Sequence, residues 1–236
     1  MEVQPNPGKH ILIDVNHETY ARYPVRTHVI TREDNLLDIC FRYTDDKLQG
    51  ADLLFISERI VAITQGRAFP ISAITAGWLA KTLSRYVHKS RHGIGLGSQW
   101  TMQLAIDEAG PLRILFAASL SAITKPFGMR GIFYRVVGNN INAIDGPCDN
   151  TIPPYNRYAK LGPAKPNAVA RRLKSELGVD VVIIDANDLG VNVLGRSSSR
   201  ISKKLCEQLF RDNPLGQSLQ QTPLCIVRRI SSAEIH

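Results

Sequence analysis

The stretch VDVVIIDANDLG, residues 179–190, decides the predicted fold class. Its apolar half predicts a buried β-strand, and an amphipathic helix is predicted directly before it, over residues 166–178. Pro166 is a favoured first helical residue and Gly178 is a favoured stop. Many α/β enzymes present ligand-binding groups at the carboxyl end of a strand in such a unit. We therefore predict an α/β fold of the mixed α+β kind, with a binding role for the polar end of the stretch.

The polar end of this stretch carries three candidate metal ligands, Asp185, Asn187 and Asp188. Oxygen donors clustered within one turn suit Mg²⁺ or Mn²⁺. The alternative is a turn in which the Asp and Asn side chains bond to their own backbone. The residues alone favour neither interpretation.

A second candidate metal site is the turn NAIDGP, residues 142–147, which contains Asp145. The Gly-Pro bend that follows fixes the direction of the chain, so the carboxylate could complete the metal site. A turn-capping aspartate is the competing interpretation, and the residues alone slightly favour it.

The amino-terminal part is predicted to alternate strands and helices. Strands are expected at residues 11–15, 23–30 and 52–57, a helix is expected after the capping residue Thr31, and another at residues 58–66. Glu58 and Arg59 then lie at a strand-to-helix junction, where backbone N–H groups can hold an anion.

The middle of the chain is predicted to end in a loop-rich functional region. Its expected elements are helices at residues 73–87 and 98–108, a strand at residues 113–122, and a strand-like IFYRVV inside a Gly-, Pro- and Asn-rich stretch at residues 125–154. Lys125 and Arg130 lie in this stretch and are suited to clamping a phosphate or a carboxylate. Solvated loop charges are the alternative interpretation.

A last helix, residues 200–210, and a last strand, residues 224–228, complete the predicted elements. No shift in composition marks a boundary, so residues 1–236 are predicted to form a single catalytic domain.

The bulk properties predict a cytoplasmic protein with an anionic partner. The formal charge of +8 suits a nucleic acid, a nucleotide or a polyacid equally. No apolar stretch approaches the roughly 18 residues that a membrane-spanning helix needs, and no secretory signal begins the sequence, so we expect no membrane partner. The four cysteines are scattered without a CxxC pair, which argues against a zinc site.

Taken together, three motifs resemble those of a known family, the coenzyme F420-0:L-glutamate ligases, also called γ-glutamyl ligases. DLLFISERIVAITQGR (residues 52–67) is similar to the family's strand followed by S-K-I-V-S-K-A-E-G-R. GNNINAIDG (138–146) is similar to A-N-A-G-I-D, and VDVVIIDANDLG (179–190) is similar to V-V-I-S-D-T-x-G-R.

The resemblance implies a ligase that uses GTP or ATP and two divalent cations, Mg²⁺ or Mn²⁺, to join L-glutamate to a carboxylate acceptor. It also implies the family's fold, with mixed sheets and flanking helices, and a homodimer with active sites near the subunit interface. Asp145, Asn187 and Asp188 match metal-binding positions of the family, and Asp185 is a further candidate ligand.

The resemblance places the nucleotide on several segments. Thr27, His28, Val29 and Ile30 match one nucleotide-contacting segment, and Glu58 with Arg59 match another. Gly195 and Arg196 resemble the family's late G-R turn, also near the nucleotide. Lys125 and Arg130 are our candidates for the catalytic cations that hold the acceptor or the phosphate.

Departures from the family pattern leave the acceptor open. Ile63 stands where a nucleotide-binding lysine is common, and the stretch between Asp188 and Arg196 is shorter than in typical members. A ligase for a folate or for a growing polyglutamate chain is therefore an alternative. A basic nucleic-acid-binding protein is an alternative of another class, although the chain has no recognisable nucleic-acid-binding motif.

Overall fold

The computed structural model describes residues 4–87, 95–129, 131–138, 141–187, 190–216 and 218–230. Two predicted site residues, Arg130 and Asp188, lie outside these ranges. The chain forms two compact units: Met1–Gln65 with Pro163–His236, which we call the sheet unit, and Gly66–Gly162, which we call the helical unit. Each unit is described by itself.

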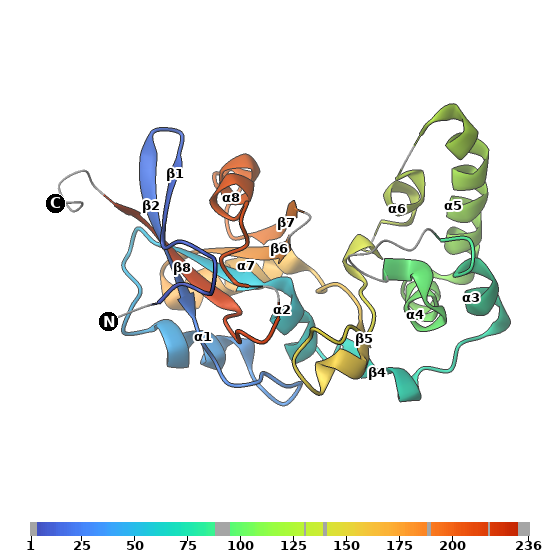
Figure 1. Cartoon of the computed structure of the whole chain (residues 1–236), viewed down its shortest axis with the longest axis horizontal. Coiled ribbons are helices and arrows are strands. Elements are labelled where there is room, and N and C mark those ends of the chain that lie inside the picture. Colours follow the sequence, from blue (N-terminus) through green and yellow to red (C-terminus); the bar gives the residue numbers. More distant parts are fainter. Residues whose placement is uncertain are drawn as a thin grey trace. The chain divides into compact units, whose positions relative to one another are not determined.

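The sheet unit is built on a mixed six-stranded sheet with the order β1-β2-β8-β3-β6-β7 (Figure 1). The strands are β1 (Leu12–Val15), β2 (Glu18–Val25), β3 (Leu53–Ser57), β6 (Asp180–Asn187), β7 (Gly190–Arg196) and β8 (Leu224–Ile230). β3 and β6 pair in parallel, and the other neighbouring pairs are antiparallel. The predicted mixed α/β fold is confirmed.

Helices bury both faces of this sheet. They are α1 (Leu36–Thr44), α2 (Glu58–Thr64), α7 (Pro166–Leu177) and α8 (Lys203–Leu209), with α8 above the sheet in Figure 1 and α1 and α2 below it. Phe55 stacks on Phe210 beside α8, with ring centroids 4.2 Å apart. Leu54, the next residue along the strand, points to the opposite face and is also fully buried. Burial on both faces explains why the strand at residues 179–185 is almost continuously apolar.

In the sheet unit, two predicted boundaries are wrong and one strand was missed. The strand predicted at residues 23–30 ends at Val25. The residue that caps α1 is Asn35, whose side chain accepts from the N–H of Leu37, and not Thr31. β7 was not predicted, because the polar residues that end β6 were interpreted as a turn.

The helical unit contains one two-stranded sheet and several short helices. Its elements are β4 (Ala68–Pro70), β5 (Tyr158–Lys160), α3 (Trp78–Leu83), α4 (Gln99–Ala109), α5 (Pro111–Thr124), α6 (Ile132–Val137) and the 3-10 helices Ile71–Ala73, Gly95–Gly97, Lys125–Phe127, Ile141–Ala143 and Tyr155–Arg157. Ser98 caps α4 as predicted, because its side chain accepts from the N–H of Thr101 at 3.1 Å. In the described part of the chain, no helix has the length and the apolar character needed to cross a membrane.

The two strands predicted in this unit are wrong. Residues 113–122 belong to α5 and IFYRVV forms α6. α5 begins at Pro111, directly after Gly110, whose φ of 84° breaks the preceding helix. Apolar residues lie on both the buried and the exposed side of α5, so their spacing along the sequence does not indicate a helix with one apolar face.

Candidate functional site

The predicted metal ligands Asp185 and Asn187 lie near the end of β6, where the strand turns back into β7. Asp185 pairs with Asn192, and Asn187 pairs with Gly190. Because side chains alternate along a strand, Asp185 and Asn187 project from the same face. Their side chains meet, with the Nδ2 of Asn187 3.5 Å from an Oδ of Asp185. The hairpin therefore places the two side chains together, in contact through the amide nitrogen of Asn187, and their metal role stays a prediction.

Asp145 lies in the helical unit and is held by a short backbone pairing. Its N–H donates to the carbonyl of Lys160 at 3.1 Å, and its carbonyl accepts from the N–H of Lys160 at 2.9 Å. An Oδ of Asp145 accepts from the N–H of Gly146 at 2.9 Å, which is the turn-capping bond of the alternative interpretation. This bond occupies one carboxylate oxygen, so the metal role of Asp145 stays a prediction.

Sequence analysis missed Lys160. Its side chain is 4% exposed, and its Nζ donates to the carbonyl of Ala143 at 2.9 Å, which fixes the turn that carries Asp145. No local signal marks this residue, because the contact joins segments that are distant in sequence.

The metal prediction as a whole is not decided by the described residues. Among them, no group of three His, Cys, Asp or Glu side chains lies close enough together to hold a metal ion. Asp188 lies outside the described ranges, and Asp145 belongs to the helical unit whereas Asp185 belongs to the sheet unit.

The predicted strand-to-helix junction is confirmed at Ser57 and Glu58, where β3 passes directly into α2. Glu58 is 5% exposed and lies in the first helical turn, where the helix dipole favours a carboxylate. Ile63, at the position where the family often has a lysine, is also buried, at 4% exposed. The nucleotide contacts of Glu58 and Arg59 stay predictions.

The predicted nucleotide segment Thr27, His28, Val29 and Ile30 follows β2 as an extended loop. The N–H of Thr27 donates to the carbonyl of Gln221 at 2.9 Å. The His28 ring lies between the hydroxyl of Tyr43, 2.8 Å from Nδ1, and the carboxylate of Asp34, 3.1 Å from Nε2. These bonds fix the position of His28, and its nucleotide contact stays a prediction.

Asp34 is held as a carboxylate by the same loop. Burial by itself raises the pKa of Asp34, but hydrogen bonds from the N–H of Thr31, from His28 and from the hydroxyl of Thr31 lower the pKa below its ordinary value. Thr31 thus binds Asp34 instead of capping a helix, which explains why the sequence suggested a capping residue here.

Gly195 and Arg196 lie where β7 meets the start of α7. A Cβ on Gly195 would lie 2.6 Å from the carbonyl carbon of Pro166, so no larger residue fits without movement. The N–H of Arg196 donates to the Oδ1 of Asn167 at 2.9 Å, and its guanidinium donates to the carbonyl of Ile201. These contacts give both residues a packing role, while their nucleotide contact stays a prediction.

Lys125 lies on the surface of the helical unit, in the 3-10 turn that follows α5. The predicted loop after a buried strand is therefore a turn after a helix. Lys125 has no ion pair and no side-chain hydrogen bond among the residues that the structure describes. Its role as a catalytic cation stays a prediction, as does that of Arg130.

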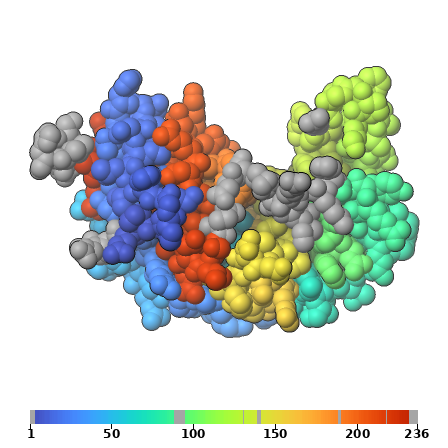
Figure 2. Space-filling model, in the orientation of Figure 1, coloured from blue at the N-terminus to red at the C-terminus, as the bar shows by residue number. Residues whose placement is uncertain are grey.

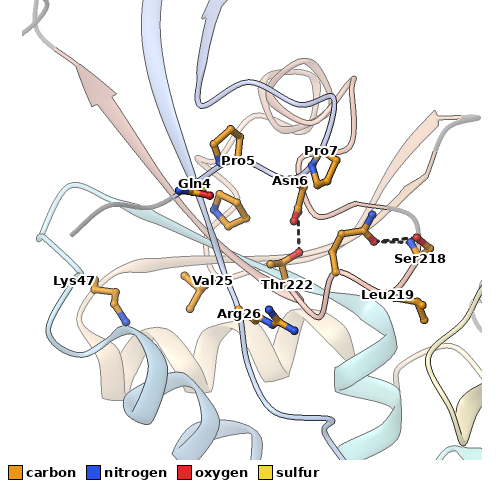
Figure 3. A pocket seen from close by; sticks show the side chains of 12 residues that line it. Gln4, Pro5, Asn6, Pro7, Val25, Arg26, Lys47, Ser218, Leu219 and Thr222 are labelled. Atoms are coloured by element: carbon orange, nitrogen blue, oxygen red, sulfur yellow. Dashed lines mark hydrogen bonds between the residues drawn. The ribbon is translucent and has the colours of Figure 1, made fainter.

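A pocket of about 580 Å³ opens in the sheet unit and was not predicted (Figure 3). Residues 4–7 lie on one side of it and Arg26 and Lys47 on the other, and it is closed by Ser218, Leu219, Gln220 and Thr222. The exposed Arg26 has no ion pair among the described residues, and it directly precedes the predicted nucleotide segment. The ammonium of Lys47 donates to the carbonyl of Tyr43 at 2.7 Å and pairs with Asp46 at 3.4 Å, so Arg26 is the cation in this pocket that favours an anionic ligand.

A comparison of the chain with models of known protein families gives one match. The family model described as F420-0:gamma-glutamyl ligase matches residues 24–233 of the 236-residue chain. The chain therefore belongs to the F420-0:gamma-glutamyl ligase family, a family of ligases, and this confirms the resemblance found in the sequence. No match is found among curated proteins.

Proposed function

We propose that this protein is an NTP-dependent ligase that joins L-glutamate to a carboxylate acceptor through an amide bond. The family match over residues 24–233 carries this proposal. A carboxylate does not condense with an amine at neutral pH unless it is first activated. The acceptor carboxylate therefore takes the γ-phosphoryl group and releases the nucleoside diphosphate. The amino group of glutamate then attacks the acyl carbon, loses a proton and displaces phosphate.

The oxygen donors at the end of β6 fit a divalent cation. Mg²⁺ is usually held by one or two carboxylates together with waters and the phosphates of the substrate, so a complete cage of protein ligands is not needed. When bound, the cation neutralises charge that develops on the transferred phosphoryl group. Asp185 and Asn187 would hold it, with Asp188 as a further ligand, and the metal role of Asp145 in the helical unit stays a separate prediction.

The pocket beside Arg26 supports a nucleotide position in the sheet unit. Arg26 would attract the phosphates, and residues Thr27 to Ile30 would contact the rest of the nucleotide. We expect Arg26→Ala to raise the KM for the nucleotide about tenfold, since a charge-assisted hydrogen bond contributes about 1.5–3 kcal/mol. Lys203→Gln, which removes an exposed cation elsewhere in the sheet unit, should leave this KM unchanged.

The acceptor is proposed to differ from that of typical members. Asn187 pairs directly with Gly190, so β6 and β7 are joined by a tight hairpin. A tight hairpin has no room for the longer segment that helps typical members bind their substrate. This observation favours a folate or a growing polyglutamate chain as the alternative acceptor to F420-0.

A ligation assay with matched variants tests the proposal. The purified chain is incubated with GTP or ATP, Mg²⁺ or Mn²⁺, glutamate and a panel of acceptors, and mass spectrometry detects added glutamyl units. We expect Asp145→Asn, Asp185→Asn and Asp188→Asn each to lower turnover by at least about a hundredfold, because each removes charge that stabilises phosphoryl transfer.

The control for this assay is Asp149→Asn, which neutralises an exposed carboxylate four residues from Asp145 and should keep full activity. Circular dichroism checks that each variant is folded. Unchanged turnover in all three metal-ligand variants would contradict the metal assignment. Tight RNA binding without any NTP turnover would contradict the proposed ligase function.

A further inference from the structure

Helix α5 exposes its large apolar side chains. Leu112 is 81% exposed, Phe116 62%, Ile123 64% and Leu115 40%. The positions are spaced by three, four and seven residues, so the four side chains lie on one face of the helix. We call these four residues the α5 face; the segment that contains α5 is yellow-green in Figure 2.

The opposite side of α5 packs against the rest of the helical unit. Ile114 and Ala117 are fully buried there. An ordinary surface helix exposes mainly polar residues, so α5 is unusual in carrying large apolar side chains on its exposed side as well as on its buried side. The turn after α5 extends the exposed apolar surface with Phe127, 76% exposed, and Met129, 47% exposed.

The surroundings of the α5 face are positively charged. The sequence contains no Asp or Glu between Pro111 and Ile144. Arg113 and Lys125 lie at the two ends of α5, and both are exposed. Neither side chain has an ion pair or a hydrogen bond among the described residues, so both charges are available to an external anion.

The helical unit holds nearly all the net charge of the protein. Its eleven Lys and Arg residues against four Asp and Glu residues give a formal charge of +7, whereas the sheet unit has +1. The partner of the α5 face must therefore be both apolar and negatively charged.

We propose that the α5 face docks the protein on the surface of a membrane that contains anionic lipids. The apolar side chains would lie among the acyl chains near the headgroups, and Arg113 and Lys125 would contact lipid phosphates. A second copy of the chain fits less well, because two helical units of charge +7 would face each other. A nucleic acid would satisfy the charge but would leave Leu112, Leu115 and Ile123 without an apolar partner.

This proposal revises the expectation of no membrane partner and is independent of the proposed function. It concerns attachment to a surface and not a spanning segment, because α5 has 14 residues. It also gives Lys125 a role that competes with its predicted catalytic one.

Vesicle flotation of the full chain tests the proposal. We expect binding to mixed phosphatidylglycerol–phosphatidylcholine vesicles to be at least about tenfold tighter than to phosphatidylcholine alone, since each cation near an anionic surface contributes to attraction. Added salt should weaken it. The double variant Phe116→Ser and Ile123→Ser should weaken vesicle binding about tenfold or more. Serine does not provide the favourable free energy that an apolar side chain gains when it moves from water into the bilayer. The pair Arg113→Gln and Lys125→Gln should weaken it about tenfold.

Matched controls come from the sheet unit. Leu12→Ser removes an apolar side chain that is 52% exposed, and Lys203→Gln with Lys204→Gln removes two exposed cations. These variants should bind vesicles like the original protein. Absence of binding to the mixed vesicles would overturn the proposal. An equal loss of vesicle binding in the control variants would also overturn it. The same holds if an α5-face variant dissociates a dimer without changing vesicle binding.

Discussion

At Gly195 the backbone of β7 approaches the first residue of α7 so closely that a side chain would collide with Pro166. The three nearest atoms to a Cβ would be the carbonyl carbon, the carbonyl oxygen and the Cβ of Pro166, all within 2.8 Å. Two of them are backbone atoms that cannot rotate away. We expect Gly195→Ala to lower the free energy of unfolding by about 1–3 kcal/mol, as overpacking in a core does.

Urea unfolding measures this change, and Gly50→Ala is the matched control. A Cβ on Gly50 would meet nothing within 4 Å, and its φ is not in the left-handed region. Equal stability of the two variants would contradict the packing role of Gly195.

At the residue scale, the sequence pointed to a local cluster but missed a distant contact. The polar turn after the predicted strand suggested Asp185 and Asn187, whose side chains meet in the structure, and their metal role stays a prediction. Lys160 could not be found, because its bond to the carbonyl of Ala143 depends on a pairing across 17 residues.

At the scale of elements, the start of α1 is fixed by the N-cap residue Asn35. Asn35 has an extended backbone and its side chain accepts from the N–H of Leu37 at 2.9 Å. We expect Asn35→Ala to lower the free energy of unfolding by about 1 kcal/mol, since it leaves a first-turn N–H without its acceptor. Glu33→Ala, at a carboxylate that is 79% exposed, is the control for thermal unfolding and should change stability by less than about 0.5 kcal/mol. An equal loss in both variants would exclude a specific cap.

α7 and β6, whose apolar residues follow the usual spacing, were predicted, whereas α5, which has apolar residues on both sides, was not. α7 and β6 carry conventional patterns, with Leu173 and Val181 in the core. α5 exposes Leu112 and Phe116, so its apolar residues were taken for a buried strand. Gly110 followed by Pro111 was the available signal for a helix start.

At the scale of the whole molecule, the mixed α/β class followed from the sequence but the distribution of charge did not. The +8 of the chain was interpreted as a property of one domain. Only the division of the chain into two units, with boundaries after Gln65 and after Gly162, shows that the helical unit carries most of the positive charge. The two units are interleaved in sequence, so no composition shift could reveal this.

The sheet unit also concentrates the carboxyl groups with lowered pKa, and this makes the stability of the protein depend on pH. Burial alone raises the pKa of Asp34, Asp180 and Asp212, but hydrogen bonds lower the pKa of all three below the ordinary value. Asp34 accepts from Thr31 and His28, and Asp180 accepts from Lys174 and Ser197. Asp212 accepts from Arg22. A folded pKa below the unfolded one means that unfolding takes up protons in acid. The stabilisation is therefore complete above about pH 4 and is lost as the pH falls further.

We expect the free energy of unfolding, measured by urea titration with circular dichroism, to fall as the pH is lowered from about 4 toward 2. Asp212→Asn should reduce this slope, because one of the three groups no longer titrates. The variant should also be less stable at neutral pH, since the Arg22 side chain is 1% exposed and loses the carboxylate that it binds through both terminal nitrogens. Asp46→Asn, at a carboxylate that is 79% exposed, should keep the original slope. The same slope in Asp212→Asn as in the original chain would show that the Arg22 pair does not govern acid unfolding.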